Sequence, residues 1–267
     1  MLIVGERLNS TAKSVAAAIA ARDVEFVRRQ AQAQVEAGAD YLDLNAAAGV
    51  EREVEDLVWL VNTVQECVQV PLCIDSPNPQ ALAAGLEACR QPAMVNSTTA
   101  ERERAATVIP LAARYHAKLV ALTMDDAGMP STGRDRLALA QRLVAMAGEA
   151  GIPVGDVYID PLVRPVASEP GQGQALLEGM ALIRAALPEV HMTCGLSNIS
   201  YGLPARKLLN RTFLAMAIAN GLDAAILDPT DRMLMATMYA AEALLGRDEY
   251  CMNYLTAHRA GRLEPQG

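Results

Sequence analysis

The stretch Leu72-Cys73-Ile74-Asp75-Ser76 is a short apolar run that ends on a carboxylate. Comparable runs, rich in Val, Ile and Leu, recur along the chain, and a stretch of helically spaced apolar residues precedes each of them. Runs of this length and composition are typical of strands buried on both faces of a parallel sheet. Polar residues end the recurring runs, namely Asp43 with Asn45, Asn96 with Ser97, Asp160, and Ser197 with Asn198. The sequence therefore predicts a parallel sheet with polar side chains gathered where its strands end.

Eight such strands can be placed, and helical patterns lie between them. The expected strands cover residues 2–6, 41–45, 72–75, 93–96, 119–123, 157–160, 192–198 and 224–228. The expected helices run from the N-cap Asp23 to Gly38, and over 57–64, 82–89, 101–115, 135–144, 176–187 and 208–220. This alternation predicts a (β/α)8 barrel, the TIM-barrel fold. The alternative is an open doubly wound sheet, but Gly5 is followed by Glu-Arg-Leu-Asn rather than by the G-x-G-x-x-G expected there.

Composition and charge argue against several function classes. Apolar residues make up 52% of the chain, but they never form the uninterrupted run of roughly 18 that a membrane helix needs. The first residues turn charged too early, at Glu6 and Arg7, for a signal peptide, so a cytoplasmic protein is expected. The net charge is −8 with both signs interspersed, which argues against a nucleic-acid partner. No linker interrupts residues 1–267, which are expected to form a single domain.

The cysteines and histidines do not indicate a metal site. The cysteines form no C-x-x-C pair, and the histidines form no H-x-x-H pair. Three cysteines lie in strand or helix patterns, where a small buried thiol fits. The residues concerned are Cys67, Cys73, Cys89, Cys194 and Cys251, and His116, His191 and His258. We expect no bound metal.

Polar residues at the strand ends are expected to converge, because the strands of a barrel place all their carboxyl ends on one face. These residues are Glu6, Asn9, Asp43, Asn45, Asp75, Asn96, Asp160, Asn198 and Asp228. Amides and carboxylates suit a flat, neutral heterocycle that carries N–H donors beside ring-nitrogen and carbonyl acceptors. Helix capping or loop bonding explains Asp43, Asn45 and Asp228 equally well. For Asp75, Asn96 and Asp160, ligand binding is favoured.

Seven motifs together resemble one known family. They are Val4-Gly5-Glu6-Arg7-Leu8-Asn9, Leu42-Asp43-Leu44-Asn45, Cys73-Ile74-Asp75-Ser76, Asn96-Ser97-Thr98 with Glu101-Arg102-Glu103, Tyr158-Ile159-Asp160-Pro161-Leu162, Gly195-Leu196-Ser197-Asn198-Ile199-Ser200 and Asn210-Arg211-Thr212-Phe213-Leu214. In this order they resemble the pterin-binding methyltransferases, which move a methyl group between methyltetrahydrofolate and a corrinoid (cobalamin) held on a separate protein. The resemblance spans nearly the whole chain. It implies an enzyme that uses tetrahydrofolate or methyltetrahydrofolate as its substrate.

The resemblance also implies roles for individual residues. Positions that hydrogen-bond the pterin ring in the family match Asp75, Asn96 and Asp160, and an asparagine near pterin N5 matches Asn198. A folate-facing arginine matches Arg206, and wall positions of the pocket match Ser197 and Ile226. The expected catalytic residues are Asn198 and Asp160. Residues 201–205, Tyr-Gly-Leu-Pro-Ala, depart from a more polar loop in the family.

The expected chemistry explains why an amide would sit near N5. A methyl group leaves a tertiary amine poorly, because the departing nitrogen carries the bonding electrons away as an anion. A hydrogen-bond donor that strengthens as this charge develops lowers the barrier. The sequence therefore predicts SN2-like methyl transfer with Asn198 as the main transition-state contact, in either direction.

The sequence also predicts the partners of the protein and leaves two alternative functions open. A separate corrinoid protein is expected, since no histidine stands in a D-x-H-x-x-G element. The resemblance implies a homodimer, and the last helix, with Met233, Met235 and Met238, can supply interface surface or, more simply, core packing. Dihydropteroate synthase, the nearest enzyme alternative, resembles the chain in its barrel and pterin pocket. It should have basic residues near the last two strands and a histidine after the fifth or eighth strand, but strand five ends here in Leu122-Thr123-Met124-Asp125-Asp126 and strand eight in Leu227-Asp228-Pro229, with neither histidine nor lysine. A folate-binding protein without catalysis is the other alternative.

Overall fold

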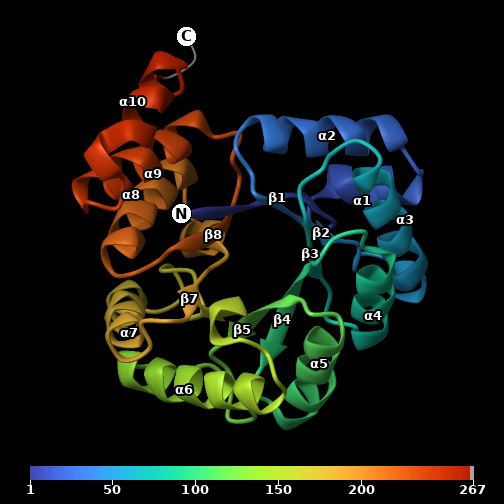
Figure 1. Cartoon of the computed structure of the whole chain (residues 1–267), viewed down its shortest axis with the longest axis horizontal. Coiled ribbons are helices and arrows are strands. Elements are labelled where there is room, and N and C mark those ends of the chain that lie inside the picture. Colours follow the sequence, from blue (N-terminus) through green and yellow to red (C-terminus); the bar gives the residue numbers. More distant parts are fainter. Residues whose placement is uncertain (265–267) are drawn as a thin grey trace.

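The computed structural model of the protein describes residues 1–264 and shows parallel strands arranged as a barrel inside a ring of helices (Figure 1). The strands are β1 (Leu2–Asn9), β2 (Tyr41–Asn45), β3 (Leu72–Asp75), β4 (Met94–Thr99), β5 (Lys118–Leu122), β6 (Val157–Asp160), β7 (His191–Met192) and β8 (Ala224–Leu227). Strands β1 to β7 pair in order, and β8 pairs with β1. The ring closes where Ile226 N donates to Cys194 O at 2.9 Å. The prediction of a (β/α)8 barrel is confirmed.

Helices cover the outside of the barrel. They are α1 (Lys13–Ala20), α2 (Val24–Glu36), α3 (Glu53–Gln65), α4 (Pro79–Ala88), α5 (Arg102–Arg114), α6 (Gly133–Glu149), α7 (Gln172–Ala186), α8 (Arg206–Ala219), α9 (Arg232–Leu244) and α10 (Met252–Arg259), with 3-10 segments η1 (Val50–Arg52), η2 (Val154–Asp156), η3 (Leu196–Ser200) and η4 (Glu249–Cys251). As predicted, Asp23 caps α2 by accepting a hydrogen bond from Phe26 N at 3.0 Å. None of the helices within residues 1–264 has the length and apolar character needed to cross a membrane.

The seventh strand is the main error in the predicted elements. The sequence predicts a strand over 192–198, whereas β7 ends at Met192 and the chain winds into η3 from Leu196. Gly195 keeps only an isolated bridge to Ile226. Short polar side chains such as Ser and Asn favour turns over ladders, which is why an apolar start here does not continue as a strand. The helices α1 and α10 were also not predicted.

The apolar core has two parts, separated by the wall of the barrel. The larger part lies between strands and helices, and buries outward-facing side chains such as Leu42, Leu44 and Ile74. The smaller part fills the barrel interior with Val4, Cys73, Met94, Val120, Tyr158, Ala224 and Ile226. In α9, Met235 and Met238 are buried in the larger part, which supports the core-packing reading of that helix. Each fully buried side chain of this size stabilises the fold by roughly 1.5–3 kcal/mol.

Candidate active site

Strand β1 carries a β-bulge that lets two of its polar residues face the mouth of the barrel, where the strands end. Its pairing with β2 runs from Gly5 opposite Leu42 to Leu8 opposite Leu44, so β1 holds one extra residue over this step. In a regular strand, residues three apart point to opposite faces. Because of the extra residue, Glu6 and Asn9 both reach partners at the mouth: the Ser197 hydroxyl donates to Glu6 Oε1 at 2.7 Å, and Asn9 Nδ2 donates to Asp75.

Four polar residues from four successive strands stand in one row at this mouth. The strand register pairs Asn9 with Asn45, Asn45 with Asp75, and Asp75 with Asn96. Both Asn9 Nδ2 and Asn45 Nδ2 donate to the same oxygen of Asp75, Oδ2, at 3.1 and 3.0 Å. Within residues 1–264, Oδ1 of Asp75 receives no such bond. One oxygen therefore positions the carboxyl group, and the other can accept hydrogen bonds from a ligand.

The protonation of Asp75 is set near the lower end of the physiological range. Burial raises the pKa of Asp75 to about 6, although the hydrogen bonds from Asn45 and Asn9 and the charge of Arg104 act in the opposite direction. The carboxyl group is therefore mostly ionised at neutral pH and can accept paired N–H bonds from a heterocycle.

Asp43 lies one layer below the row and holds Asn96. The Asn96 carboxamide donates from Nδ2 to Asp43 Oδ1 at 3.1 Å. Burial, followed by the charge of the neighbouring Asp75, raises the pKa of Asp43 well above its usual range. This inward contact argues against the helix-capping interpretation of Asp43. Asn45 bonds its own loop, because its Oδ1 accepts a hydrogen bond from Ala47 N at 3.1 Å, and its Nδ2 also donates to Asp75.

Asp160 ends β6 on the other side of the mouth. Its Oδ1 accepts a hydrogen bond from Leu162 N at 2.8 Å, and the backbone of Gly195 also bonds its carboxyl group. Burial raises the pKa of Asp160 to about 7 against these two bonds. Asp160 therefore changes between a hydrogen-bond acceptor and a neutral acid close to neutral pH.

The η3 turn and the start of α8 carry three further predicted residues, Ser197, Asn198 and Arg206. The guanidinium of Arg206 donates to Ser197 O at 2.7 Å and to Ser200 Oγ at 3.0 Å, so it braces the turn from the start of α8. The Ser197 hydroxyl bonds Glu6 across the mouth, and burial raises the pKa of Glu6. The side chain of Asn198, in the same turn, is exposed and makes no hydrogen bond within residues 1–264. Its donors and acceptor are thus available to a ligand.

The predicted residues at the mouth converge, with two differences of detail. Asp228 lies near Glu6, but it pairs with Arg7 at 2.9 Å and binds its own loop through Thr230, which supports the loop-bonding reading. Arg206 acts on the η3 backbone in this structure and is exposed, while Ile226 belongs to the inner core below the mouth. Among residues 1–264, no group of three His, Cys, Asp or Glu side chains is placed to hold a metal ion.

Sequence reasoning missed Arg104, in the first turn of α5. Its guanidinium donates to the carbonyls of Ser97, Ser76 and Pro77 at 2.6–2.9 Å, 2.8 Å and 2.5 Å respectively. The first two of these residues directly follow Asn96 and Asp75. In the sequence, Arg104 stands among Glu101, Arg102 and Glu103, where it is indistinguishable from a solvated surface charge.

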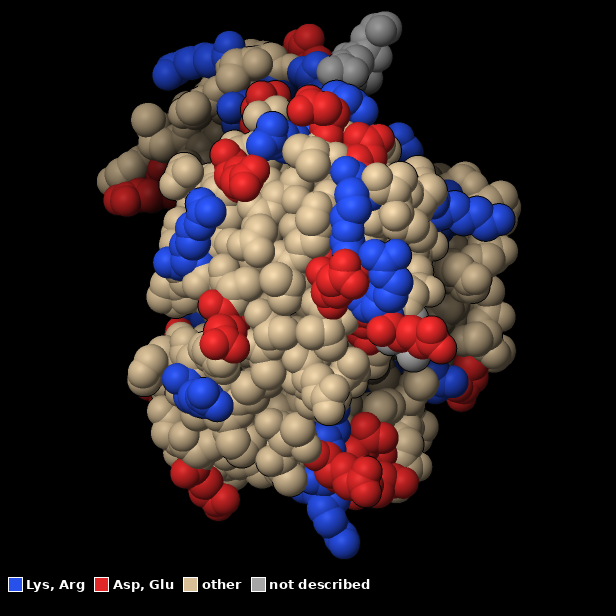
Figure 2. All heavy atoms as spheres, turned by 90° about the vertical axis from the view of Figure 1, so that its right-hand side faces the viewer, with Lys and Arg blue, Asp and Glu red and all other residues tan. Residues whose placement is uncertain are grey.

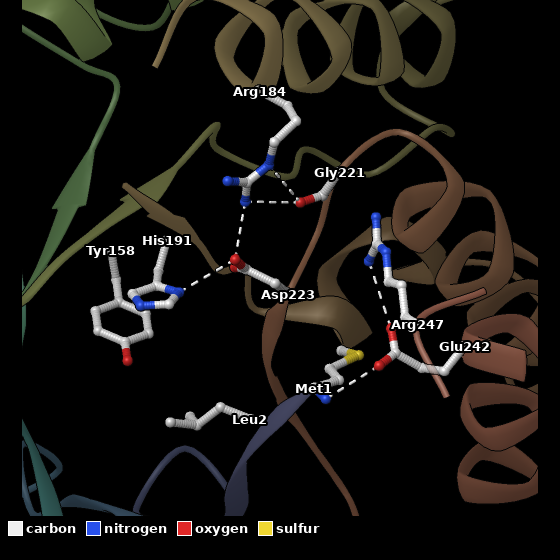
Figure 3. Close-up of a pocket in the computed structure, with 9 residues that line it drawn as sticks. All are labelled: Met1, Leu2, Tyr158, Arg184, His191, Gly221, Asp223, Glu242 and Arg247. Atoms are coloured by element: carbon white, nitrogen blue, oxygen red, sulfur yellow. Dashed lines mark hydrogen bonds and ion pairs between the residues drawn. The ribbon is translucent and has the colours of Figure 1, made fainter. Parts of the chain in front are cut away.

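A hollow lies at the opposite end of the barrel from the mouth (Figure 3). Its volume is about 450 Å³, and it lies beside Leu2, Tyr158, His191 and Asp223, near the beginnings of β1, β6, β7 and β8. Figure 3 shows the His191 ring beside Tyr158, with ring centroids 4.7 Å apart, and Arg184 reaching Asp223. Catalytic groups in TIM barrels lie at the carboxyl ends of the strands. The candidate active site is therefore the mouth rather than this hollow.

Comparison with known proteins identifies the family. A family model described as "Pterin binding enzyme" matches residues 5–228, which include the whole row at the mouth. The chain belongs to the pterin-binding enzymes. It is 41% identical over 270 residues to "Methylcorrinoid:tetrahydrofolate methyltransferase" of Eubacterium limosum, covering 99% of this chain and 98% of that protein. This near-complete match identifies the chain as a methyltransferase.

Two further proteins resemble the chain over a small part of their length or in fold alone. A methionine synthase of Mycobacterium tuberculosis is 32% identical over 241 residues, which are 85% of this chain but only 20% of that much longer protein. A solved structure of dihydropteroate synthetase with a product superimposes with a TM-score of 0.71 at 16% identity, covering 92% of this chain and 94% of that one. At so low an identity, this likeness shows the fold alone.

Proposed function

We propose that this pterin-binding methyltransferase moves a methyl group between N5 of methyltetrahydrofolate and the cobalt of a corrinoid carried by a separate protein. The near-complete match to a relative named methylcorrinoid:tetrahydrofolate methyltransferase is the observation that carries the proposal. The donor set at the mouth fits a pterin, because carboxylate and amide groups can pair with the amino-pyrimidinone edge of that heterocycle. The same site serves both directions of transfer.

Pterin binding is assigned to the two walls of the mouth. Asp75 offers its unbonded Oδ1 as an acceptor, and Asn96 offers the part of its carboxamide that Asp43 does not use. Asp160 faces them from β6 and accepts an N–H when it is ionised. Fixing the ring between these groups orients N5 toward the open end of the barrel, and such orientation supplies a large part of a rate enhancement. We assign Ser197, Arg206 and Ile226 to the surroundings of the folate.

Asn198 is assigned the transition-state contact. When methyl leaves, the carbon–nitrogen bond breaks and its electron pair stays on N5, while the corrinoid supplies the electron pair that receives the methyl carbon. The Asn198 carboxamide has uncommitted N–H donors at the mouth, and a donor to N5 binds more strongly as negative charge grows there. Asp160 stands beside the Gly195 backbone at the base of the same turn and helps to hold a proton or water near N5.

The decisive experiment mixes the protein with Co(I) cobalamin and methyltetrahydrofolate and follows loss of the Co(I) absorbance. We expect turnover with the wild type and folate binding by calorimetry. Absence of both would overturn the proposal. Binding without turnover, in the presence of a range of corrinoid proteins as well as free cobalamin, would support the alternative of a folate-binding protein.

Assembly and location are proposed on separate observations. The end of α9, η4 and the start of α10 expose Leu244, Tyr250 and Met252, with 88%, 85% and 53% of their surfaces accessible. We propose a homodimer that covers them. Sedimentation of the wild type and of Leu244→Glu tests this.

We propose a cytoplasmic location, because all five cysteines are free thiols, as in a reducing cytoplasm. Figure 2 shows Lys and Arg interspersed with Asp and Glu on the face that it draws, so that face offers nucleic acid no basic stripe. We further propose that residues 1–267 act as one domain.

A further inference from the structure

Arg104 joins the ends of the two strands that carry Asp75 and Asn96. Its Nε and Nη2 both donate to Ser97 O, at 2.9 and 2.6 Å, and Nη2 also donates to Ser76 O at 2.8 Å. The remaining nitrogen, Nη1, donates to Pro77 O at 2.5 Å. One planar group thus engages three carbonyls that lie immediately beyond β3 and in β4.

This geometry needs the guanidinium fork rather than a positive charge alone. Arginine presents five N–H donors in a fixed plane, whereas a lysine ammonium is a compact charge on a flexible stem. The strand ladder pairs Asp75 with Asn96, and Ser76 N donates to Asn96 O at 3.1 Å, but the chain beyond these residues is joined across the two strands by the fork. Loss of the fork therefore loosens the ends of the two strands that carry Asp75 and Asn96.

The charge of Arg104 also acts on Asp75. Arg104 is half-buried and forms no ion pair within residues 1–264, so its charge is not neutralised by a close carboxylate. The groups that face Asp75 are Asp43 from β2, Glu53 from α3 and Arg104 from α5. Arg104 is the cation among them, and it holds the pKa of Asp75 lower than burial alone would.

We infer that Arg104 is a positioning residue for the pterin, which fixes the spacing of Asp75 and Asn96 through its fork and favours the Asp75 carboxylate through its charge. The inference rests on the proposed function, since it concerns the same pterin site. Within residues 1–264, the side-chain hydrogen bonds of Arg104 all go to backbone carbonyls, so it acts through the two side chains that we assign to the ligand.

Two substitutions separate the fork from the charge. Arg104→Lys keeps the charge and removes the fork, so its dissociation constant for methyltetrahydrofolate, measured by calorimetry, should rise about ten-fold with an unchanged pH dependence. Arg104→Gln removes both, so its affinity should in addition begin to fall at a higher pH than that of Arg104→Lys. Arg102→Gln is the matched control, because Arg102 lies in the same turn with an exposed side chain. It should bind like the wild type.

Each outcome decides something different. A wild type that does not bind methyltetrahydrofolate sinks the proposed function itself. A wild type that binds, with Arg104→Lys within two-fold of it, overturns the role of the fork. Equal pH profiles for Arg104→Lys and a folded Arg104→Gln overturn the role of the charge. If Arg104→Gln does not fold, a folded but weakened Arg104→Lys still supports the fork, and an unweakened one refutes it.

Discussion

The two ends of the barrel are both rich in polar groups, yet they use them in opposite ways. At the base, Asp223 accepts hydrogen bonds with both oxygens, from Arg184 and His191 on one and from Met192 N on the other. At the mouth, Asp75 and Asn198 keep hydrogen-bonding atoms without partners among residues 1–264. The base has the 450 Å³ hollow, but the mouth has the unused bonding capacity. Unused capacity, rather than the size of a hollow, indicates where a ligand binds.

The electrostatics sharpen this contrast. Burial raises the pKa of Glu6, Asp43, Asp75 and Asp160, which are all at the mouth. A buried carboxylate without a strong cationic partner weakens the fold, and such groups gather at functional sites. The contrast therefore predicts that mutations at the mouth impair function and those at the base impair stability.

The largest effect should follow from Asn198→Ala. Loss of one hydrogen bond to a developing charge typically lowers a rate by about 10²–10³. We expect such a loss in methyl transfer to free cobalamin, with folate affinity changed less than about three-fold, since the contact strengthens only in the transition state. Stopped-flow loss of Co(I) absorbance and calorimetry measure the two quantities. An unchanged rate with intact binding would show that the assignment to Asn198 is wrong.

The second prediction is that Asp160→Asn stabilises the protein at pH 8. The pKa of Asp160 is raised to about 7 in the folded state, above an unfolded value of about 3.9, so the folded state binds its proton more tightly. Stability is thus lost as the pH rises from about 4 to 7, and at pH 8 the charged group costs about 2–4 kcal/mol. Urea unfolding of both proteins should show a clear gain at pH 8 and a small one at pH 4.5. Methyl transfer should fall in the same variant.

At the base of the barrel, Asp223→Ala should lower stability and leave activity nearly unchanged. It leaves Arg184, His191 and the Met192 amide without their shared acceptor, which should lower the free energy of unfolding by about 2–3 kcal/mol. The methyl-transfer rate at 25 °C and the folate affinity should stay within about two-fold, because the site lies at the other end of the strands. A strong loss of folate affinity in a folded variant would break the comparison between the two ends.

The smallest expected effect is the pH dependence of folate binding. Asp75 and Asp160, with pKa values of about 6 and about 7, accept N–H bonds when ionised. Affinity for methyltetrahydrofolate should therefore fall by about ten-fold between pH 8 and pH 6, mostly through protonation of Asp160. Calorimetry across this range measures it, and Asp160→Asn serves as the control, whose residual dependence should centre near the pKa of Asp75. A flat wild-type profile would contradict the assignment.

Much of the fold could be predicted from local sequence patterns, but the contacts within the site could not. The strands ending at Asn45, Asp75 and Asp160 have the predicted bounds, because a buried apolar run bounded by a polar residue is a local signal. The turn that carries Asn198 was wrongly predicted as part of a strand. Strand β7 ends early because it does not form a continuous ladder with β8, and this is a long-range feature that the local pattern does not show.

The geometry of the site depends on contacts between residues that are far apart in the sequence. The row at the mouth could be foreseen as a set of polar strand ends, but the pairing of Asn96 with Asp43 depends on which residue lies one layer lower. Arg104 could not be foreseen at all, because its partners are backbone carbonyls, which every residue has. Side-chain type gives no signal for such a contact.

The extra residue in β1 makes the site depend on the length of the chain as well as on its composition. Glu6 and Asn9 meet their partners across the mouth only because the strand gains one position between Gly5 and Leu8. A deletion of one residue there would leave every functional side chain in the protein, yet it would turn either Glu6 or Asn9 toward the surrounding helices. In this chain, the number of residues between Gly5 and Leu8 is therefore as much a part of the site as the identity of those residues.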